Sequence, residues 1–186
     1  AASDVYKRQD WYPSLAIWII ALILLINYVF PFGLRLKDKG LPGNISISIS
    51  VGLVVVFGAS AVFEPFSEKA WSLFFVGIFY NTSREIIKDV QDMEGDKGRN
   101  TLAMRIGSEN ARTVAWVMSI LALASVLLPF AIGIFPPLHV VLVIPAVMTL
   151  MMVKGRIIIG EDASASSLLK KSMLLCLAAL LTSSLI

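Results

Sequence analysis

Six long runs of apolar residues fill most of this sequence, with short polar stretches between them. The runs cover residues 13–34, 45–63, 70–87, 111–134, 138–153 and 168–186. A helix needs about 20 residues to cross a hydrocarbon core about 30 Å thick, and these runs reach or approach that length. They are continuous rather than alternating with a period of two residues, which predicts helices and not the strands of a barrel. The expected fold is therefore all-α, a multi-span transmembrane bundle of six helices.

Composition agrees with a membrane protein and gives little support to other classes. Hydrophobic residues make up 57% of the 186 residues and charged residues 16%, whereas a soluble domain carries about 25% charged residues. The net charge of +3 comes from basic residues spread over short loops, so no nucleic-acid partner is indicated. The single cysteine, Cys176, lies in an apolar run and predicts no disulfide. The lipid bilayer is the expected partner, and nothing indicates a protein partner.

Lysine and arginine residues predict how the helices are oriented. If the six spans alternate in direction, the loops near 35–44, 84–112 and 154–171 share one side and hold thirteen of the 16 lysines and arginines. The positive-inside rule places these loops in the cytoplasm and both ends of the chain outside. Residues 1–10, AASDVYKRQD, carry Lys7 and Arg8 on the wrong side and lack the pattern of a signal peptide. We interpret 1–10 as a leader foreign to the protein and 11–186 as part of a single transmembrane domain.

Glycines in the second apolar run predict close helix packing. Gly52 and Gly58 lie six residues apart in this run. Small residues let the backbones of neighbouring membrane helices approach each other. We expect both glycines to face an adjacent helix.

Three aspartates stand where the third run meets the cytoplasmic side, in the stretch REIIKDVQDMEGD at 84–96. On a helix with 100° per residue, Asp89, Asp92 and Asp96 fall within about 60° of one another. This projection requires a helix that continues to Asp96. Gly95 and Gly98 allow the helix to end earlier, in which case a turn positions Asp96.

Clustered carboxylates repel each other unless a cation lies among them. Oxygen ligands without histidine or cysteine favour Mg²⁺ or Ca²⁺ over zinc. Four cations flank the aspartates and can balance the charge of bound phosphates: Arg84, Lys88, Lys97 and Arg99. The combination predicts a site for Mg²⁺ and a diphosphate, above a deeper apolar part of the same helix face that carries Trp71 and Phe75. The alternative is an exposed helix end whose charges neutralise each other, for instance Glu85 with Lys88.

The same residues resemble a known family of membrane enzymes. The stretch YNTSREIIKDVQDMEGDKGRNTLAMRIG at 80–107 resembles the second aspartate-rich motif of the UbiA family of intramembrane prenyltransferases, KDxxDxxGD followed by TLxxxxG. Upstream, LRLKDKGLPGNISISISVGLVVVFG at 34–58 resembles the family's LK and GN segment before an apolar helix. The likeness covers about 13–186. The motif REIIKDxxDxxGD at 84–96 is most similar to that of family members that act in archaeal-type ether-lipid biosynthesis.

The resemblance implies an enzyme with nine helices around a cavity, in which Mg²⁺ between two aspartate-rich motifs holds a prenyl diphosphate. It implies transfer of a geranylgeranyl group to the hydroxyl of a glycerol-phosphate lipid, forming an ether. Carried over by position, the catalytic and metal-binding residues are Asp89, Asp92 and Asp96, and the diphosphate-binding residues are Arg84, Lys88, Lys37 and Asn44.

The sequence departs from the family pattern in two respects. The first motif, of the form NDxxDxxxD, does not occur, and six helices are three fewer than nine. We therefore expect 11–186 to be the C-terminal part of a prenyltransferase domain, inactive by itself. Two alternatives stay open: a sister enzyme that prenylates an aromatic acceptor of a quinone, haem or chlorophyll pathway, and a cation-coupled transporter. A transporter would carry ionisable groups near the middle of several helices.

Overall fold

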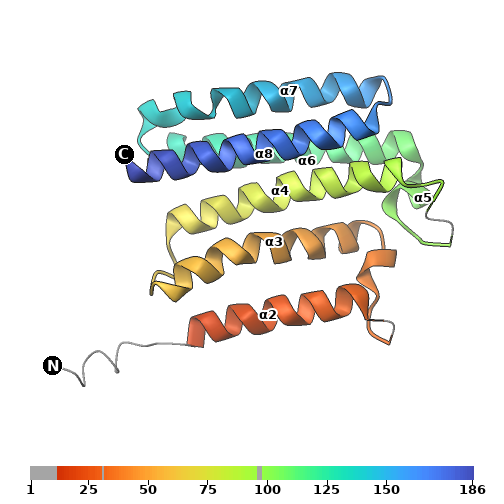
Figure 1. Cartoon of the computed structure of the whole chain (residues 1–186), viewed down its shortest axis with the longest axis horizontal. Helices are drawn as coiled ribbons and strands as arrows, with labels where there is room; N and C mark the ends of the chain where they lie inside the picture. Colours follow the sequence, from red (N-terminus) through yellow and green to blue (C-terminus); the bar gives the residue numbers. More distant parts are fainter. Residues whose placement is uncertain (1–11, 31, 96–97) are drawn as a thin grey trace.

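A computed structural model of the chain describes residues 12–30, 32–95 and 98–186. In this part of the chain all regular secondary structure is helical, and six long helices lie side by side, each running opposite to the one before it (Figure 1). The long helices are α2 (Tyr12–Val29), α3 (Leu41–Ala61), α4 (Glu68–Gln91), α6 (Ser108–Ala131), α7 (Ile144–Ile158) and α8 (Asp162–Leu185). The short ones are η1 (Leu36–Asp38), α5 (Leu102–Ile106) and η2 (Pro137–Val143). The prediction of an all-α bundle is confirmed.

Five helical segments of the described chain are long and apolar enough to cross a membrane: α2, α3, α6, α8 and the unit formed by η2 with α7. The chain is therefore an integral membrane protein. The sixth long helix, α4, has 24 residues but is less apolar, because its second half carries residues such as Asn81, Arg84, Glu85 and Lys88. This helix packs against α3, α6 and α8. Much of its surface therefore meets protein instead of lipid, which allows a polar helix at this depth.

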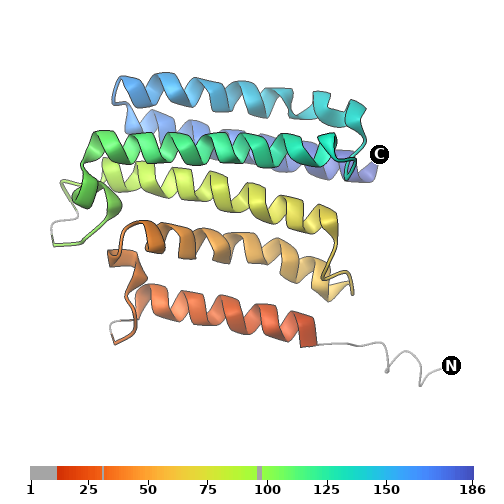
Figure 2. The same cartoon turned by 180° about the vertical axis from the view of Figure 1, so that it is seen from behind.

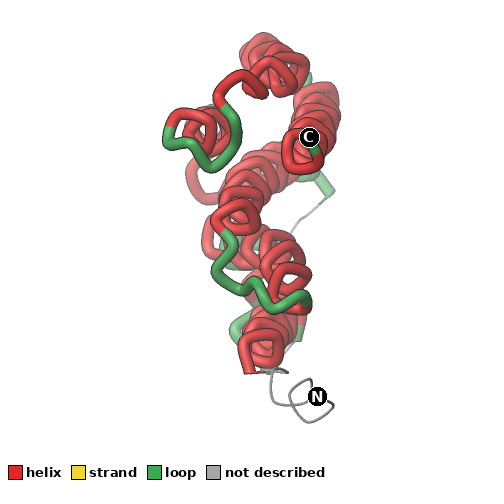
Figure 3. Tube along the Cα trace, turned by 90° about the vertical axis from the view of Figure 1, so that its left-hand side faces the viewer, coloured by secondary structure: helices red, strands yellow, loops and turns green. Residues whose placement is uncertain are grey.

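The helices form one row that widens at one end. Helices α2, α3 and α4 follow one another, and α6, α7 and α8 group beyond α4 (Figures 1 and 2). Seen along the helices, α4 lies between the α2–α3 pair and this group (Figure 3). The larger buried core lies among α4, α6, α7 and α8 and includes Tyr80, Leu150 and Leu169. A smaller core of Leu53 and Phe74 with their neighbours joins α3 to α4 and α2.

The connections alternate between the two ends of the bundle as the sequence predicted. The loops that join α2 to α3, α4 to α6 and α7 to α8 lie at one end (Figure 1). The turns from α3 to α4 and from α6 to η2 lie at the other, together with the start of α2 and the end of α8. The three loops rich in lysine and arginine thus share one side of the bundle.

Several helix boundaries differ from the prediction. The fifth run, predicted to end at residue 153, continues to Ile158, and it begins as the 3₁₀ helix η2. Pro145 lies in the first turn of α7, where a proline needs no backbone N–H to donate. Helix α8 begins at Asp162 with Glu161 as its N-cap, six residues before the last apolar run starts at 168. The short α5 was not predicted; the hydroxyl of Thr101 caps it by accepting from the backbone N–H of Met104 at 3.4 Å.

Helices α3 and α4 approach closely at a glycine. A Cβ at Gly52 would lie 2.8 Å from Cδ2 and 3.1 Å from the backbone oxygen of Phe74. The prediction of a close contact is confirmed for Gly52. It is wrong for Gly58, whose Cβ would meet nothing within 4 Å because this residue faces open space.

Gly52→Ala should lower stability, since the added methyl group forces Phe74 and its helix to shift. Overpacking of this kind costs about 1–3 kcal/mol. Gly58→Ala on the same helix is the matched control and should be neutral or stabilising by about 0.5–1 kcal/mol, because alanine is the better helix former. Thermal unfolding of both variants in detergent measures the difference. Equal midpoints for the two variants would contradict the α3–α4 contact.

Candidate active site

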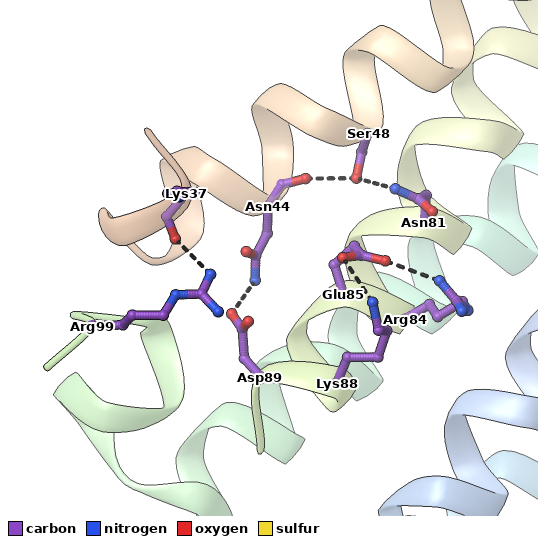
Figure 4. A network of polar contacts seen from close by, with 9 residues as sticks. All are labelled: Lys37, Asn44, Ser48, Asn81, Arg84, Glu85, Lys88, Asp89 and Arg99. Atoms are coloured by element: carbon purple, nitrogen blue, oxygen red, sulfur yellow. Dashed lines mark hydrogen bonds and ion pairs between the residues drawn. The ribbon is translucent and has the colours of Figure 1, made fainter. Parts of the chain in front are cut away.

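The first residues of α3 meet the last turn of α4 through a hydrogen bond between predicted site residues. Asn44 Nδ2 donates to Asp89 Oδ2 at 2.9 Å (Figure 4). Asn44 is only 7% exposed. Its backbone oxygen accepts from the hydroxyl of Ser48 at 2.6 Å, and that hydroxyl accepts from Asn81 Nδ2 at 3.1 Å. A chain of hydrogen bonds thus runs from the buried middle of α3 and α4 to the Asp89 carboxylate.

The two predicted diphosphate-binding cations of α4 lie on either side of Glu85. Arg84 Nη1 is 2.9 Å from Glu85 Oε1, and Lys88 Nζ is 3.6 Å from Glu85 Oε2 (Figure 4). The Nε of Arg84 is buried and has no hydrogen-bond partner. The Glu85–Lys88 pair is the contact expected if this helix end neutralises its own charges. Arg84, however, keeps donors that Glu85 does not use.

Arg99 ties the loop after α4 to the loop before α3. Its Nη2 donates to the backbone oxygen of Lys37 at 3.3 Å, and its Nε lies 3.4 Å from Asp38 Oδ1. Beside this contact, Gly40 has a φ of 67° and its Cβ would lie 3.0 Å from the backbone nitrogen of Leu102. The two backbones therefore touch directly, and glycine is the residue that both the left-handed conformation and the contact favour. This contact holds Lys37 on the same side as the Asn44–Asp89 pair (Figure 4).

The structure places two of the three aspartates. Asp89 lies in the last turn of α4 and reaches Asn44. Asp92 is the C-cap, with its backbone N–H donating to the oxygen of Lys88 at 2.9 Å and its side chain exposed. A turn follows, in which the N–H of Gly95 donates to the Asp92 oxygen at 3.0 Å. The helical projection therefore applies no further than Asp92, and Asp96 lies outside the described residues.

The side chains of the described residues do not by themselves form a metal site. Within residues 12–30, 32–95 and 98–186, no group of three or more His, Cys, Asp or Glu side chains is arranged to hold an ion. Asp89, Asp92 and the amide oxygen of Asn44 supply oxygen donors only. This donor chemistry is the kind that Mg²⁺ prefers.

The residues joined by these contacts form one polar cluster: Lys37, Asp38, Asn44, Ser48, Asn81, Arg84, Glu85, Lys88, Asp89 and Arg99. Arg99 was predicted as a cation for the phosphates, whereas four members were not predicted as site residues: Asp38, Ser48, Asn81 and Glu85. Lys97 lies outside the described residues. Two of them carried a usable signal, because a serine and an asparagine inside apolar runs indicate a buried polar contact. Glu85 was expected only as a partner of Lys88. The pairing of Arg99 with the Lys37–Asp38 turn joins two distant loops and has no counterpart in local spacing.

An apolar groove of about 500 Å³ opens between α4 and α6 in the half of the bundle away from the polar cluster. Its lining includes Trp71, Phe75, Phe79, Leu121, Leu128 and Pro129. Phe75 and Asp89 are 14 residues apart on one helix, which corresponds to about 21 Å along its axis. The aromatic residues expected below the aspartates thus line a groove with room for a hydrocarbon chain.

The sequence pattern of the UbiA prenyltransferase family matches residues 11–180. The chain belongs to this family. The resemblance seen in the 80–107 and 34–58 stretches is confirmed, and in the structure these two stretches are the ones joined by the Asn44–Asp89 and Arg99–Lys37 contacts.

Relatives similar to this chain include proteins named digeranylgeranylglyceryl phosphate synthase. The Methanopyrus kandleri protein is 33% identical over 169 residues, which are 89% of this chain and 61% of the relative. The Halobacterium salinarum protein is 32% identical over 171 residues, 90% of this chain and 59% of the relative. The Methanosarcina mazei protein is 36% identical over 133 residues, which are 70% of this chain and 44% of the relative. The chain thus spans 61% or less of each of these three relatives. No solved structure matches the chain significantly.

The Asn44–Asp89 hydrogen bond should stabilise the α3–α4 contact measurably. In a double-mutant cycle with Asn44→Ala and Asp89→Ala, we expect a coupling energy of about 1–3 kcal/mol in thermal or denaturant unfolding, because the acceptor is a carboxyl group and the donor is buried. The cycle contains its own control, since Asn44→Ala should cost less once Asp89 is already alanine. Additive effects would show that the two side chains do not interact.

Proposed function

We propose that this chain carries the second aspartate-rich half of the active site of a membrane prenyltransferase. The reaction transfers a geranylgeranyl group from geranylgeranyl diphosphate to the free hydroxyl of geranylgeranylglyceryl phosphate. The observation that carries the proposal is the convergence of Arg84, Lys88 and the Asn44–Asp89 pair at one end of α4, while the other half of α4 lines an apolar groove. The names of the relatives support the acceptor class, since their product carries two geranylgeranyl groups on a glyceryl phosphate.

Mg²⁺ fits the residues that would hold it. This ion binds through one or two carboxylates together with substrate phosphates and keeps several waters. Asp89 and Asp92 would be its ligands in this part of the chain, with Asp96 next in sequence. When bound, the ion neutralises negative charge on the diphosphate. The hydrogen bond from Asn44 fixes the orientation of one of these carboxylates.

The cationic side chains act on the leaving group. As the bond between the allylic C1 and the diphosphate oxygen breaks, its electron pair leaves with the diphosphate. Arg84, Lys88 and Lys37 would stabilise that charge, Arg84 through its planar fork of donors. The acceptor oxygen then bonds to C1 and its proton passes to the departing diphosphate, which completes the ether. Apolar helices around the site keep water away from the electron-poor C1.

The positive-inside rule assigns the site to the cytoplasmic side. The polar cluster includes the first turn of α3 and the last turns of α4, which lie at the end of the bundle that holds the three loops rich in lysine and arginine (Figure 1). Such loops remain on the cytoplasmic side during insertion. Both substrates would then present their phosphates at this surface, with their chains in the bilayer.

The complete gene product that carries this sequence, in lipid nanodiscs, should convert radiolabelled geranylgeranyl diphosphate and geranylgeranylglyceryl phosphate into a labelled ether lipid with Mg²⁺ and not with EDTA. We expect Asp89→Asn and Asp92→Asn to lower kcat on the order of 100-fold, because each weakens the hold on the Mg²⁺ that would neutralise the leaving diphosphate. Glu109→Gln, an exposed carboxylate at the same end of the bundle, is the control and should retain activity.

The outcomes separate the alternatives. Labelled product from an aromatic acceptor, with none from the glycerol lipid, would change the acceptor and leave the transfer chemistry in place. Full turnover by the combined Asp89→Asn and Asp92→Asn variant would refute the roles given to these carboxylates. A lack of labelled product from either acceptor would refute the proposed function itself.

A further inference from the structure

Glu85 is a carboxylate shared by two cations of its own helix. Each of its oxygens faces a different partner, Oε1 facing Arg84 and Oε2 facing Lys88. The Glu85 side chain is 19% exposed, which is less than either cation. Both partners therefore direct their charge toward one partly buried carboxylate group at the end of α4 (Figure 4).

The cations keep donors that this carboxylate does not use. Arg84 has five N–H donors, and its Nε is buried without a hydrogen-bond partner. Lys88 has three donors and lies 3.6 Å from the carboxylate, which is longer than a hydrogen bond. A carboxylate has two oxygens, whereas a diphosphate offers more oxygens and more charge. The pair is therefore better matched to a larger anion than to Glu85.

We propose that Glu85 occupies the place of the diphosphate between Arg84 and Lys88 and is displaced when the diphosphate binds. This inference rests on the proposed function, in which the two cations hold that group. Glu85 is a positioning residue: it keeps two neighbouring positive charges together while no phosphate is bound. It also competes with the bound anion, which lowers the affinity for the pyrophosphate product and speeds its release.

The surroundings favour this role for Glu85 over that of a metal ligand. Both of its oxygens already lie beside positive charges, which would repel a divalent ion at the same place. Asp89, one turn further along α4, accepts a hydrogen bond from the side-chain amide of Asn44. Glu85 therefore has a positive charge beside each of its oxygens, which makes this position unfavourable for a divalent ion.

Glu85→Gln tests the inference because it keeps the shape of the side chain and removes its charge. We expect the complete gene product with Glu85→Gln to bind inorganic pyrophosphate about fivefold to tenfold more tightly than the unaltered protein, measured by titration calorimetry with and without Mg²⁺. A purely structural role for Glu85 predicts the opposite sign, since loss of two ion pairs would disorder the cations. The control is Glu94→Gln, which removes the same charge from the turn after α4 and should change the affinity less than twofold.

A second variant, Glu85→Asp, tests the inference if Glu85→Gln does not fold. Glu85→Asp keeps the charge but shortens the side chain, so both contacts lengthen and pyrophosphate binding should tighten about twofold. Weaker or unchanged binding by a folded Glu85 variant would overturn the inference, while binding by the unaltered protein would leave the proposed function standing. If the unaltered protein does not bind pyrophosphate at all, the proposed function fails, and the inference fails with it.

Discussion

The enclosure of α4 by α3, α6 and α8 is the constraint on which the rest of the structure depends. A helix with this many polar residues is costly against lipid, because unpaired polar groups in hydrocarbon lose their hydrogen bonds. Neighbouring helices supply partners: Ser83 donates to the backbone oxygen of Ala115 at 2.8 Å, and the hydroxyls of Tyr80 and Ser172 are 2.8 Å apart. These contacts let one helix carry charges to the membrane surface while the outer helices face lipid.

The architecture was largely predictable because it follows from hydrophobic length. Continuous apolar runs fixed the number and order of the long helices, and alternation fixed which loops share an end. Boundaries were less predictable where the chain changes helix type, as at Pro145 between η2 and α7. The short α5 was missed because its five residues form a helix within a loop against the α2–α3 turn. Hydrophobicity does not report such contacts between loops.

The candidate site was predictable as a set of residues and less so as a geometry. Spacing identified Asp89, Arg84 and Lys88, and the likeness of the 34–58 stretch added Asn44, which contacts Asp89. The helical projection could not extend to Asp96, since α4 ends at Gln91. The position of Glu85 between two cations depends on how three side chains bend toward one another. The residue pattern therefore predicts which types of side chain form the site, and the fold determines which of them are in contact.

The contacts of Arg99 with the α2–α3 turn couple two loops that are far apart in the sequence. Because its guanidinium holds the Lys37 carbonyl and the Asp38 carboxylate, and because Gly40 lies against Leu102, a displacement of either loop pushes the other. Lys37 and the segment from Arg99 to Leu102 would then move together. A phosphate bound by Lys37 would therefore also displace Arg99 and the start of α5.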